Sequence, residues 1–411
     1  MRKLGSTHYE DMLYVNFEKN EEAKLAFERS LKPADICEKL EVIFDRTITE
    51  STLFFFDEIQ FCEQALTSLK YFNEDAPTRR ILAAGSLPSV ALSQKERSFP
   101  VGKITSYVLK PMDFEEFLWA LHEEPLLHHI RRSYILCAPL VTVFHEKALT
   151  LFRLYLALGG MPEVVSIYAS TGSLQEADME LNEIYTHYIN DMGKYASPSD
   201  VPKIRIIYQS IVPQLAKPNK NFKYTEVQKG KNKEYFGSSI AWLGNAEIVY
   251  LSHLVESPRY PLTAHVHPFI FRLFVNDCGL LRVLARVPIQ NIMNEQHRDD
   301  ITGIITETYI ASELRKNNLP LYYHTGGRNT EIDFLVQGSG EIIPIEVKSG
   351  TRVQSISLKR FMEEYNPSKA YRISARNFGS NGGITSIPLY AFYYLAADLA
   401  KDALPMPLPL L

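Results

Sequence analysis

The sequence predicts an α/β protein whose N-terminal part is built on a parallel β-sheet. Residues Leu53 to Phe56 form an apolar run that ends in two acids, Asp57 and Glu58. A short apolar run with a helix-like stretch after it is typical of a parallel strand that is buried on both faces. Strand-like and helix-like segments also alternate along this part of the chain, which favours a doubly wound sheet.

The predicted N-terminal elements follow one another as strand and helix. The first strand is predicted at Met12 to Phe17, and Pro33 interrupts the helical periodicity that follows it. After the apolar run come a helix near residues 62–72, a strand at 80–84 that ends in Gly85-Ser86, a strand at 101–109 and a helix at 114–121.

Polar side chains stand where two of these strands end. In a parallel sheet the carboxyl ends of the strands are where ligands bind. Asp57 is suited to hold the water shell of a magnesium ion, and Glu58 to orient a water against a phosphate. Ser86 would lie beside them as a sensor of the terminal phosphate. Two solvated acids and a plain Gly-Ser-Leu-Pro turn fit the same residues.

In these segments the sequence resembles the prokaryotic AAA+ ATPases that join an ATPase module to a C-terminal restriction-endonuclease-like domain. The resemblance implies a P-loop NTPase sheet, a helical lid, and use of ATP with Mg²⁺ through Asp57, Glu58 and Ser86. Members usually carry Arg where Lys103 stands. The residues that carry the resemblance are Asn16-Phe17, Phe56-Asp57-Glu58-Ile59-Gln60, Ala84-Gly85-Ser86, Ser98 to Lys103 and Pro111 to Phe117.

The phosphate-binding loop of this family does not occur in the sequence. Members begin with a strand and a GxxxxGK[ST] loop, whose backbone amides and lysine hold the phosphates. No Gly-Lys-Ser or Gly-Lys-Thr precedes Asp57. We expect a truncated AAA+ core that binds ATP weakly or not at all, and a shortened gene product or a misplaced start explains this better than an adaptation.

Residues 199–262 have the layout of a winged helix. A helix at 204–215, a second helix at 233–243 and an apolar strand at 246–254 lead to a turn at Ser257-Pro258. Lysines interleaved with aromatic residues suit contact with DNA phosphates without reading of bases. A solvated loop, with the winged helix used only for protein contacts, fits equally well. The predicted DNA-binding residues are Lys220, Lys223, Lys229, Lys231 and Lys233.

The C-terminal region predicts a second magnesium site. A helix at 299–316 contains Glu307, and residues 331–336 and 341–348 predict a β-hairpin. With a two-residue turn at Ser339-Gly340, Asp333 lies opposite Glu346, about 5 Å away between α-carbons. Facing carboxylates repel unless a proton or cation lies between them, so Asp333 and Glu346 predict a metal site.

Two further residues complete this prediction. Lys348 shares the face of Glu346 and would stabilise a pentavalent phosphate or lower the pKa of a bound water, and Glu307 would add a ligand from the helix. The pattern is that of the PD-(D/E)XK nuclease fold, which the family resemblance also implies. Many domains with this fold are binding modules instead.

Composition and charge set the remaining expectations. The chain has 411 residues, a net charge of −4 and four widely spaced cysteines, with no membrane-spanning stretch. These features predict a cytoplasmic protein whose net charge does not attract nucleic acid to the molecule as a whole. We expect DNA as partner, with a protein partner as the alternative, and a scaffold with vestigial sites as the alternative to an enzyme. The predicted divisions are an ATPase core at 1–124, a helical lid at 125–198, a winged helix at 199–262, a nuclease-like domain at 263–403 and a tail at 404–411.

Overall fold

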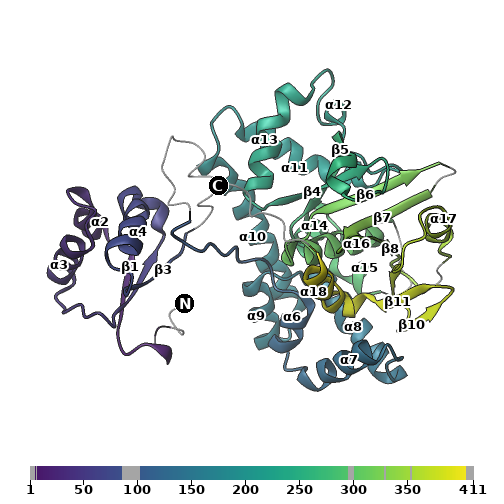
Figure 1. Cartoon of the computed structure of the whole chain (residues 1–411), viewed down its shortest axis with the longest axis horizontal. Helices are drawn as coiled ribbons and strands as arrows, with labels where there is room; N and C mark the ends of the chain where they lie inside the picture. The colour runs from purple at the N-terminus through teal and green to yellow at the C-terminus, as the bar shows by residue number, and fades with distance from the viewer. Residues whose placement is uncertain are drawn as a thin grey trace. The chain divides into compact units, whose positions relative to one another are not determined.

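The chain divides between Leu109 and Lys110 into two compact units. A computed structural model describes residues 5, 7–85, 102–294, 300–327, 330–351 and 354–403 (Figure 1). The predicted boundary at residue 124 falls inside the second unit. Phe114 and Phe117 are the reason, because both pack their rings against Tyr155, which belongs to the second unit.

In its described residues, the N-terminal unit is a three-stranded parallel sheet with helices packed against it. Strands β1 (Met12–Asn16), β2 (Leu53–Asp57) and β3 (Arg80–Ala83) lie in that order, with Tyr14 paired to Phe55 and Asn16 to Asp57. Helices α2 (Glu21–Glu28), α3 (Pro33–Phe44) and α4 (Glu63–Asp75) bury their apolar residues with those of β1 and β2, and η1 (Ile59–Phe61) follows β2. The predicted buried parallel strand at 53–56 is confirmed.

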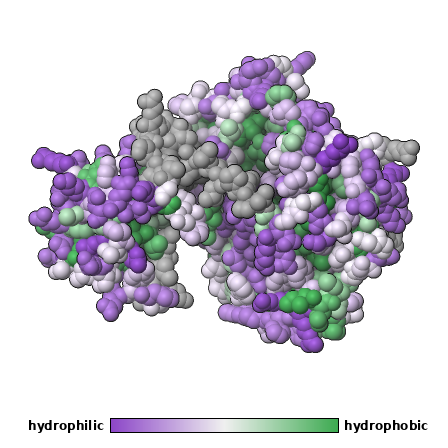
Figure 2. Space-filling view, in the orientation of Figure 1, coloured by the Kyte–Doolittle hydropathy of each residue, from purple (hydrophilic) through white to green (hydrophobic). Residues whose placement is uncertain are grey.

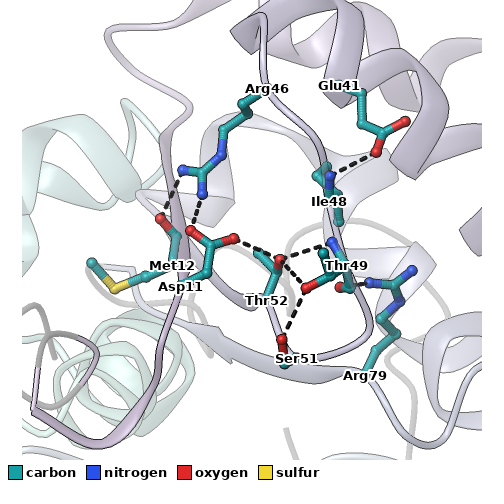
Figure 3. A network of polar contacts seen from close by, with 9 residues as sticks. All are labelled: Asp11, Met12, Glu41, Arg46, Ile48, Thr49, Ser51, Thr52 and Arg79. Carbon is teal, nitrogen blue, oxygen red and sulfur yellow. Dashed lines mark hydrogen bonds and ion pairs between the residues drawn. The ribbon is translucent and has the colours of Figure 1, made fainter.

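A polar network fixes the start of β1 against the start of β2 (Figure 3). The Thr52 hydroxyl donates to Asp11 Oδ2 at 2.6 Å, and Arg46 forms an ion pair with the same carboxylate. The hydrogen bond from Thr52 and the charge of Arg46 lower the pKa of Asp11 against the opposing effect of burial. Arg46 also donates to the Met12 carbonyl at 3.0 Å. The network lies at the opposite end of the two strands from Asp57.

The predicted strand at 101–109 is wrong for the residues that the structure describes there. Residues 102–104 form a turn and a bend, residues 105–109 have no regular secondary structure, and Tyr107 and Leu109 are exposed. An extended segment becomes a strand only when a neighbour supplies its backbone hydrogen bonds. Within the described part of this unit, β3 pairs only with β2, and residues 102–109 do not pair with its other edge.

Over its described residues, the C-terminal unit combines a set of helices with one eight-stranded sheet (Figure 1). The strand order is β10-β11-β9-β8-β7-β6-β4-β5. No helix in the described ranges is long and apolar enough to cross a membrane. The helices are α6 (Phe114–Ala120), α7 (Glu124–Leu136), α8 (Thr142–Leu158), α9 (Pro162–Thr171), α10 (Leu174–Tyr195), α11 (Val201–Leu215), α12 (Tyr224–Val227), α13 (Lys233–Asn245), η2 (Leu262–His265), α14 (Cys278–Leu284), α15 (Ile289–Met293), α16 (Asp300–Lys316), α17 (Ile356–Tyr365), η3 (Leu389–Ala391) and α18 (Phe392–Asp402). The strands are β4 (Val249–Val255), β5 (Val266–Val275), β6 (Leu321–Gly326), β7 (Thr330–Gln337), β8 (Ile342–Val347), β9 (Tyr371–Ser374), β10 (Gly379–Asn381) and β11 (Ile384–Pro388).

The elements predicted for the winged helix form, but not as a separate domain. Helices α11 and α13 and strand β4 lie where the sequence predicts them. Strand β4 pairs antiparallel with β5 on one side and parallel with β6 on the other. The predicted boundary at residue 262 therefore divides a continuous sheet, because both partners of β4 lie in the region predicted to be nuclease-like.

The surface of the C-terminal unit carries one apolar cluster near α7. Figure 2 shows hydrophobic side chains gathered at this position. Ile135, Leu136, Val141 and Val143 are each more than half exposed at the end of α7 and the start of α8.

Candidate functional site

The first acid of the N-terminal unit, Asp57, ends β2 on the sheet face that carries Tyr14. The Tyr14 hydroxyl donates to Asp57 Oδ2 at 2.6 Å, and the Asn16 side-chain amide lies 3.4 Å from the same oxygen. All three residues share a face because paired residues of parallel neighbours point the same way. The carboxylate of Asp57 therefore meets neutral donors from β1.

The second acid, Glu58, leaves the strand with a left-handed backbone. Its φ is +52°, which is uncommon for a residue with a side chain. The Gln60 side-chain amide donates to Glu58 Oε2 at 2.5 Å. Asp57 and Glu58 thus stay adjacent at the carboxyl end of the sheet, as the sequence predicts. The predicted sensor Ser86 lies outside the described residues.

Three elements bring the predicted acids of the C-terminal unit together. Glu307 comes from α16, Asp333 from β7 and Glu346 from β8. Phe334 pairs with Ile345 and Gln337 with Ile342, so the predicted turn at residues 339–340 is confirmed. Extending this register by one residue sets Asp333 opposite Glu346.

A local irregularity in β7 aims Asp333. The register between β6 and β7 shifts by one residue between the Tyr322–Leu335 and His324–Ile332 pairs, which places Asp333 inside a bulge. Bulges re-aim side chains and recur beside active sites. Asp333 Oδ2 accepts from the Val347 backbone amide at 2.8 Å, so its carboxylate reaches across to β8.

The three carboxylates are buried, and burial raises the pKa of two of them, Glu346 and Glu307. Exposed fractions are 9% for Glu307, 7% for Asp333 and 2% for Glu346. Burial raises the pKa of Glu346, and the Asp333 charge raises it further against opposing contributions from Ser355 and Lys348. Burial likewise raises the pKa of Glu307. Within the described chain, Glu346 Oε2 is buried without a hydrogen-bond partner.

Two positive side chains approach Glu346, and one of them was not foreseen from the sequence. Lys348 Nζ lies 3.7 Å from Glu346 Oε1, and its side chain is 41% exposed. Arg372 of β9 pairs in register with Glu346, and its guanidinium donates to Ser386 at 2.5 Å. The sequence offered no signal for Arg372 beyond its place in a strand.

Lys220 corrects the prediction of a surface lysine cluster. Its ammonium group lies 2.6 Å from Glu307 Oε1, and the Lys220 side chain is only 19% exposed. Burial alone would lower the pKa of Lys220, but the charges of Glu307 and Asp333 raise it, so the group stays protonated. Lys220 is held by an acid from a helix far along the chain and does not face solvent as a phosphate contact.

The other predicted DNA-binding lysines lie nearer the surface. The side chain of Lys223 is half exposed, 3.9 Å from Glu226, and Lys229 is exposed. Lys231 lies 4.1 Å from the ring centre of Tyr235, and Lys233 lies 4.5 Å from that of Phe269. These are ordinary distances for a cation over an aromatic face.

The acids at these two sites provide few ligands for a metal ion. In the ranges that the structure describes, no three His, Cys, Asp or Glu side chains are arranged so that they hold a metal ion. Magnesium is usually held by one or two carboxylates and several waters. Asp333 and Glu346 with the unpartnered Oε2 fit that requirement, and Asp57 fits it as a single ligand.

Family models match three separate parts of the chain. Residues 1–118 match an AAA domain, residues 149–291 a domain of unknown function (DUF8612) and residues 302–392 a domain of unknown function (DUF4143). No curated protein sequence is significantly similar.

Two solved structures are similar over larger parts of the chain. A Walker-type ATPase of Pyrococcus abyssi is 13% identical over 67% of this chain and 84% of its own, with a TM-score of 0.37. The protein VC1899 from Vibrio cholerae is 13% identical over 87% of this chain and 92% of its own, with a TM-score of 0.21. The family match and the parallel sheet that ends in Asp57 make the N-terminal unit an AAA-type, ATPase-like module.

Proposed function

We propose that the C-terminal unit is a magnesium-dependent nuclease that acts on DNA and is coupled to the AAA-type module. The observation that carries the proposal is the buried Oε2 of Glu346, which has no hydrogen-bond partner among the described residues and lies in a carboxylate set with Asp333. Two such acids are stable together only with a proton or a cation between them. Magnesium is the cation that these hard oxygen ligands suit.

The residues around the metal position have separate roles in this proposal. Asp333 and Glu346 would hold Mg²⁺, and Glu307 would add a ligand from α16. A bound ion would polarise a phosphate oxygen and lower the pKa of a water. Lys348 is exposed enough to reach a phosphate and stabilises the negative charge that develops when water adds and the sugar oxygen leaves. The hydrolysis transfers the proton of water to that leaving oxygen.

The AAA-type module contributes nucleotide chemistry in a weakened form. Asp57 would hold Mg²⁺, Glu58 would act as the base and Ser86 as the sensor of the terminal phosphate. The sequence has no GxxxxGK[ST] loop to hold the phosphates, so we expect ATP to bind weakly or not at all. Calorimetric titration with ATP and Mg²⁺ tests this, and micromolar affinity would contradict it.

A non-enzymatic DNA-binding or protein-interaction scaffold is the second candidate. The Lys220–Glu307 ion pair favours it, because an internal cation already neutralises one acid of the predicted site. In this reading both acid sites are vestigial and the lysines at 223–233 make the contacts. A linear fall of log affinity for DNA with log salt identifies DNA as the partner, and a flat response points to a protein.

Cleavage assays separate the two candidates. Single-stranded, duplex and branched DNA are incubated with the purified chain and Mg²⁺, beside the Asp333→Asn and Glu346→Gln variants. Either substitution is expected to reduce cleavage about a hundredfold or more. The matched control is Glu341→Gln, an acid beside the turn of the same hairpin that pairs with Lys369 at 3.5 Å. Cleavage that survives in both variants contradicts the nuclease proposal.

A further inference from the structure

The Lys220 side chain enters the acid cluster from an unusual backbone position. Lys220 lies between α11 and α12 and has a left-handed φ of +51°. A residue with a side chain adopts this conformation at a cost in free energy, so surrounding contacts must hold it. The 2.6 Å contact between the ammonium group and Glu307 offsets this cost.

The segment 219–223 that carries Lys220 is tied to the sheet at several points. The Phe222 amide donates to the Phe271 carbonyl on β5 at 2.8 Å. The Tyr323 hydroxyl on β6 donates to Asn221 Oδ1 at 2.6 Å. The Lys223 amide donates to Gln214 Oε1 on α11 at 2.5 Å. These bonds set the ammonium group at the acids, yet they lie in a short stretch of chain without a helix or strand of its own.

We propose that the ammonium group of Lys220 takes the cation position of the Glu307, Asp333 and Glu346 cluster, so that Lys220 and Mg²⁺ bind in competition. The segment 219–223 is then a latch that keeps the divalent cation out until it is displaced. This inference rests on the proposed metal site. A lysine and a divalent cation within a few ångströms repel strongly in a buried site, which makes simultaneous occupancy unfavourable.

The charges at the cluster support competition over a shared site. Lys220 contacts Glu307 at 2.6 Å, and the charge of Asp333 also acts on its ammonium group. A cation that replaced Lys220 would meet the charges of the same two acids. Glu346 lies on β8, which pairs with the strand of Asp333, and its buried Oε2 has no partner in the described residues.

Magnesium binding to a Lys220→Met variant tests the latch. Titration of Mg²⁺ is followed by calorimetry and by the midpoint of thermal unfolding. We expect affinity to rise about tenfold to a hundredfold over the wild-type chain, because binding no longer breaks a charge-assisted hydrogen bond. Addition of Glu346→Gln to this variant should cancel the gain. The matched control is Lys217→Met, which removes a half-exposed lysine just before the segment and should leave affinity unchanged.

Hydrogen exchange on the wild-type chain gives a second measurement that needs no variant. At saturating Mg²⁺ the amides of Phe222 and Lys223 should lose protection as the latch leaves the sheet. Equal affinity in the wild-type chain and Lys220→Met, or unchanged protection while Mg²⁺ binds, overturns the latch and leaves the metal site standing. No Mg²⁺ binding to either protein overturns the metal site and the latch together.

Discussion

The two acid clusters of this chain differ in what neutralises them. In the N-terminal unit, Asp57 meets the hydroxyl of Tyr14 and Glu58 meets the amide of Gln60. In the C-terminal unit, Glu307 meets the ammonium group of Lys220, and Glu346 keeps a buried oxygen without a partner in the described structure. The acids of the N-terminal cluster are half-buried and accept hydrogen bonds from neutral donors. Those of the C-terminal cluster are buried, and one of them pairs with a charged ammonium group.

Similar acid motifs in one chain can therefore differ in how strongly the stability of the fold depends on their partners. Neutral donors leave the carboxylates of the N-terminal unit free to exchange partners at little cost. A buried carboxylate needs a proton, an ammonium group or a metal, and removal of that partner is expensive. The C-terminal cluster is thus the place where substitution should have large and pH-dependent effects.

The largest effect is expected from the loss of Lys220. Lys220→Met should lower the free energy of unfolding of the C-terminal unit by about 2–4 kcal/mol, because Glu307 is left buried without its partner. Urea unfolding followed by tryptophan fluorescence reports on this unit, since Trp119 and Trp242 both lie in it. The Lys220→Met, Glu307→Gln double variant should recover most of the loss. A single variant within about 0.5 kcal/mol of wild type would break the comparison.

Glu346→Gln should have the opposite sign. Burial raises the pKa of Glu346, so folding favours its protonated form relative to the unfolded chain. The carboxylate then destabilises the fold increasingly as the pH rises above its unfolded pKa of about 4.3. We expect the Gln variant to be more stable by about 1–2 kcal/mol near neutral pH without Mg²⁺, with the gain vanishing below about pH 4.

Urea unfolding of Glu346→Gln at the two pH values measures this sign, and Asp57→Asn is the comparator. An amide at position 57 still accepts from Tyr14, so its effect on stability should stay within about 0.5 kcal/mol. Hydrogen exchange of the β2 amides reports on that unit. If the Gln variant is no more stable than the wild-type chain at neutral pH, Glu346 is already neutralised in the wild-type chain.

Tyr14→Phe should have a smaller effect on the N-terminal unit. The substitution removes the 2.6 Å hydrogen bond to Asp57 while keeping the ring contact with Phe55. We expect a loss of about 1 kcal/mol, measured by hydrogen exchange of the β1 and β2 amides. A loss of unfolding free energy as large as that of Lys220→Met would show that the partners of the two clusters contribute equally to stability.

The surface lysines should give the smallest effect on stability. Lys231→Met and Lys233→Met are expected to change the free energy of unfolding by less than about 0.5 kcal/mol. Each should reduce the salt dependence of DNA affinity by about one unit of slope, if these lysines contact phosphates. An unchanged slope in both variants would assign the surface around Tyr235 and Phe269 to another partner.

Local patterns in the sequence predicted much of the fold and most of the candidate acids. The apolar run at 53–56 predicted β2, because burial on both faces leaves a continuous apolar signal. Alternation and the Ser339-Gly340 turn predicted the register of β7 and β8, since turn length fixes pairing. Both signals act between residues that are near one another in the chain.

Features that depend on distant residues were not predictable in this way. Residues 101–109 look apolar enough for a strand, but a strand needs a sheet edge that only tertiary structure supplies. Lys220 looks like its neighbouring surface lysines, because its partner Glu307 lies 87 residues away. The bulge that aims Asp333 depends on pairing with β6, which the alternation within β7 does not reveal.

The pairing of β4 with both β5 and β6 has a practical consequence for dissection of this protein. A cut between residues 262 and 263 would place β4 in one fragment and its two partners in the other. The second fragment would then expose the apolar side chains of β5 from Phe271 to Val275 and an open β6 edge. We expect this fragment to aggregate, because unpaired strand edges pair with other chains. Co-expressed halves should regain solubility by strand complementation, whereas a cut between Leu109 and Lys110 follows the natural division of the chain.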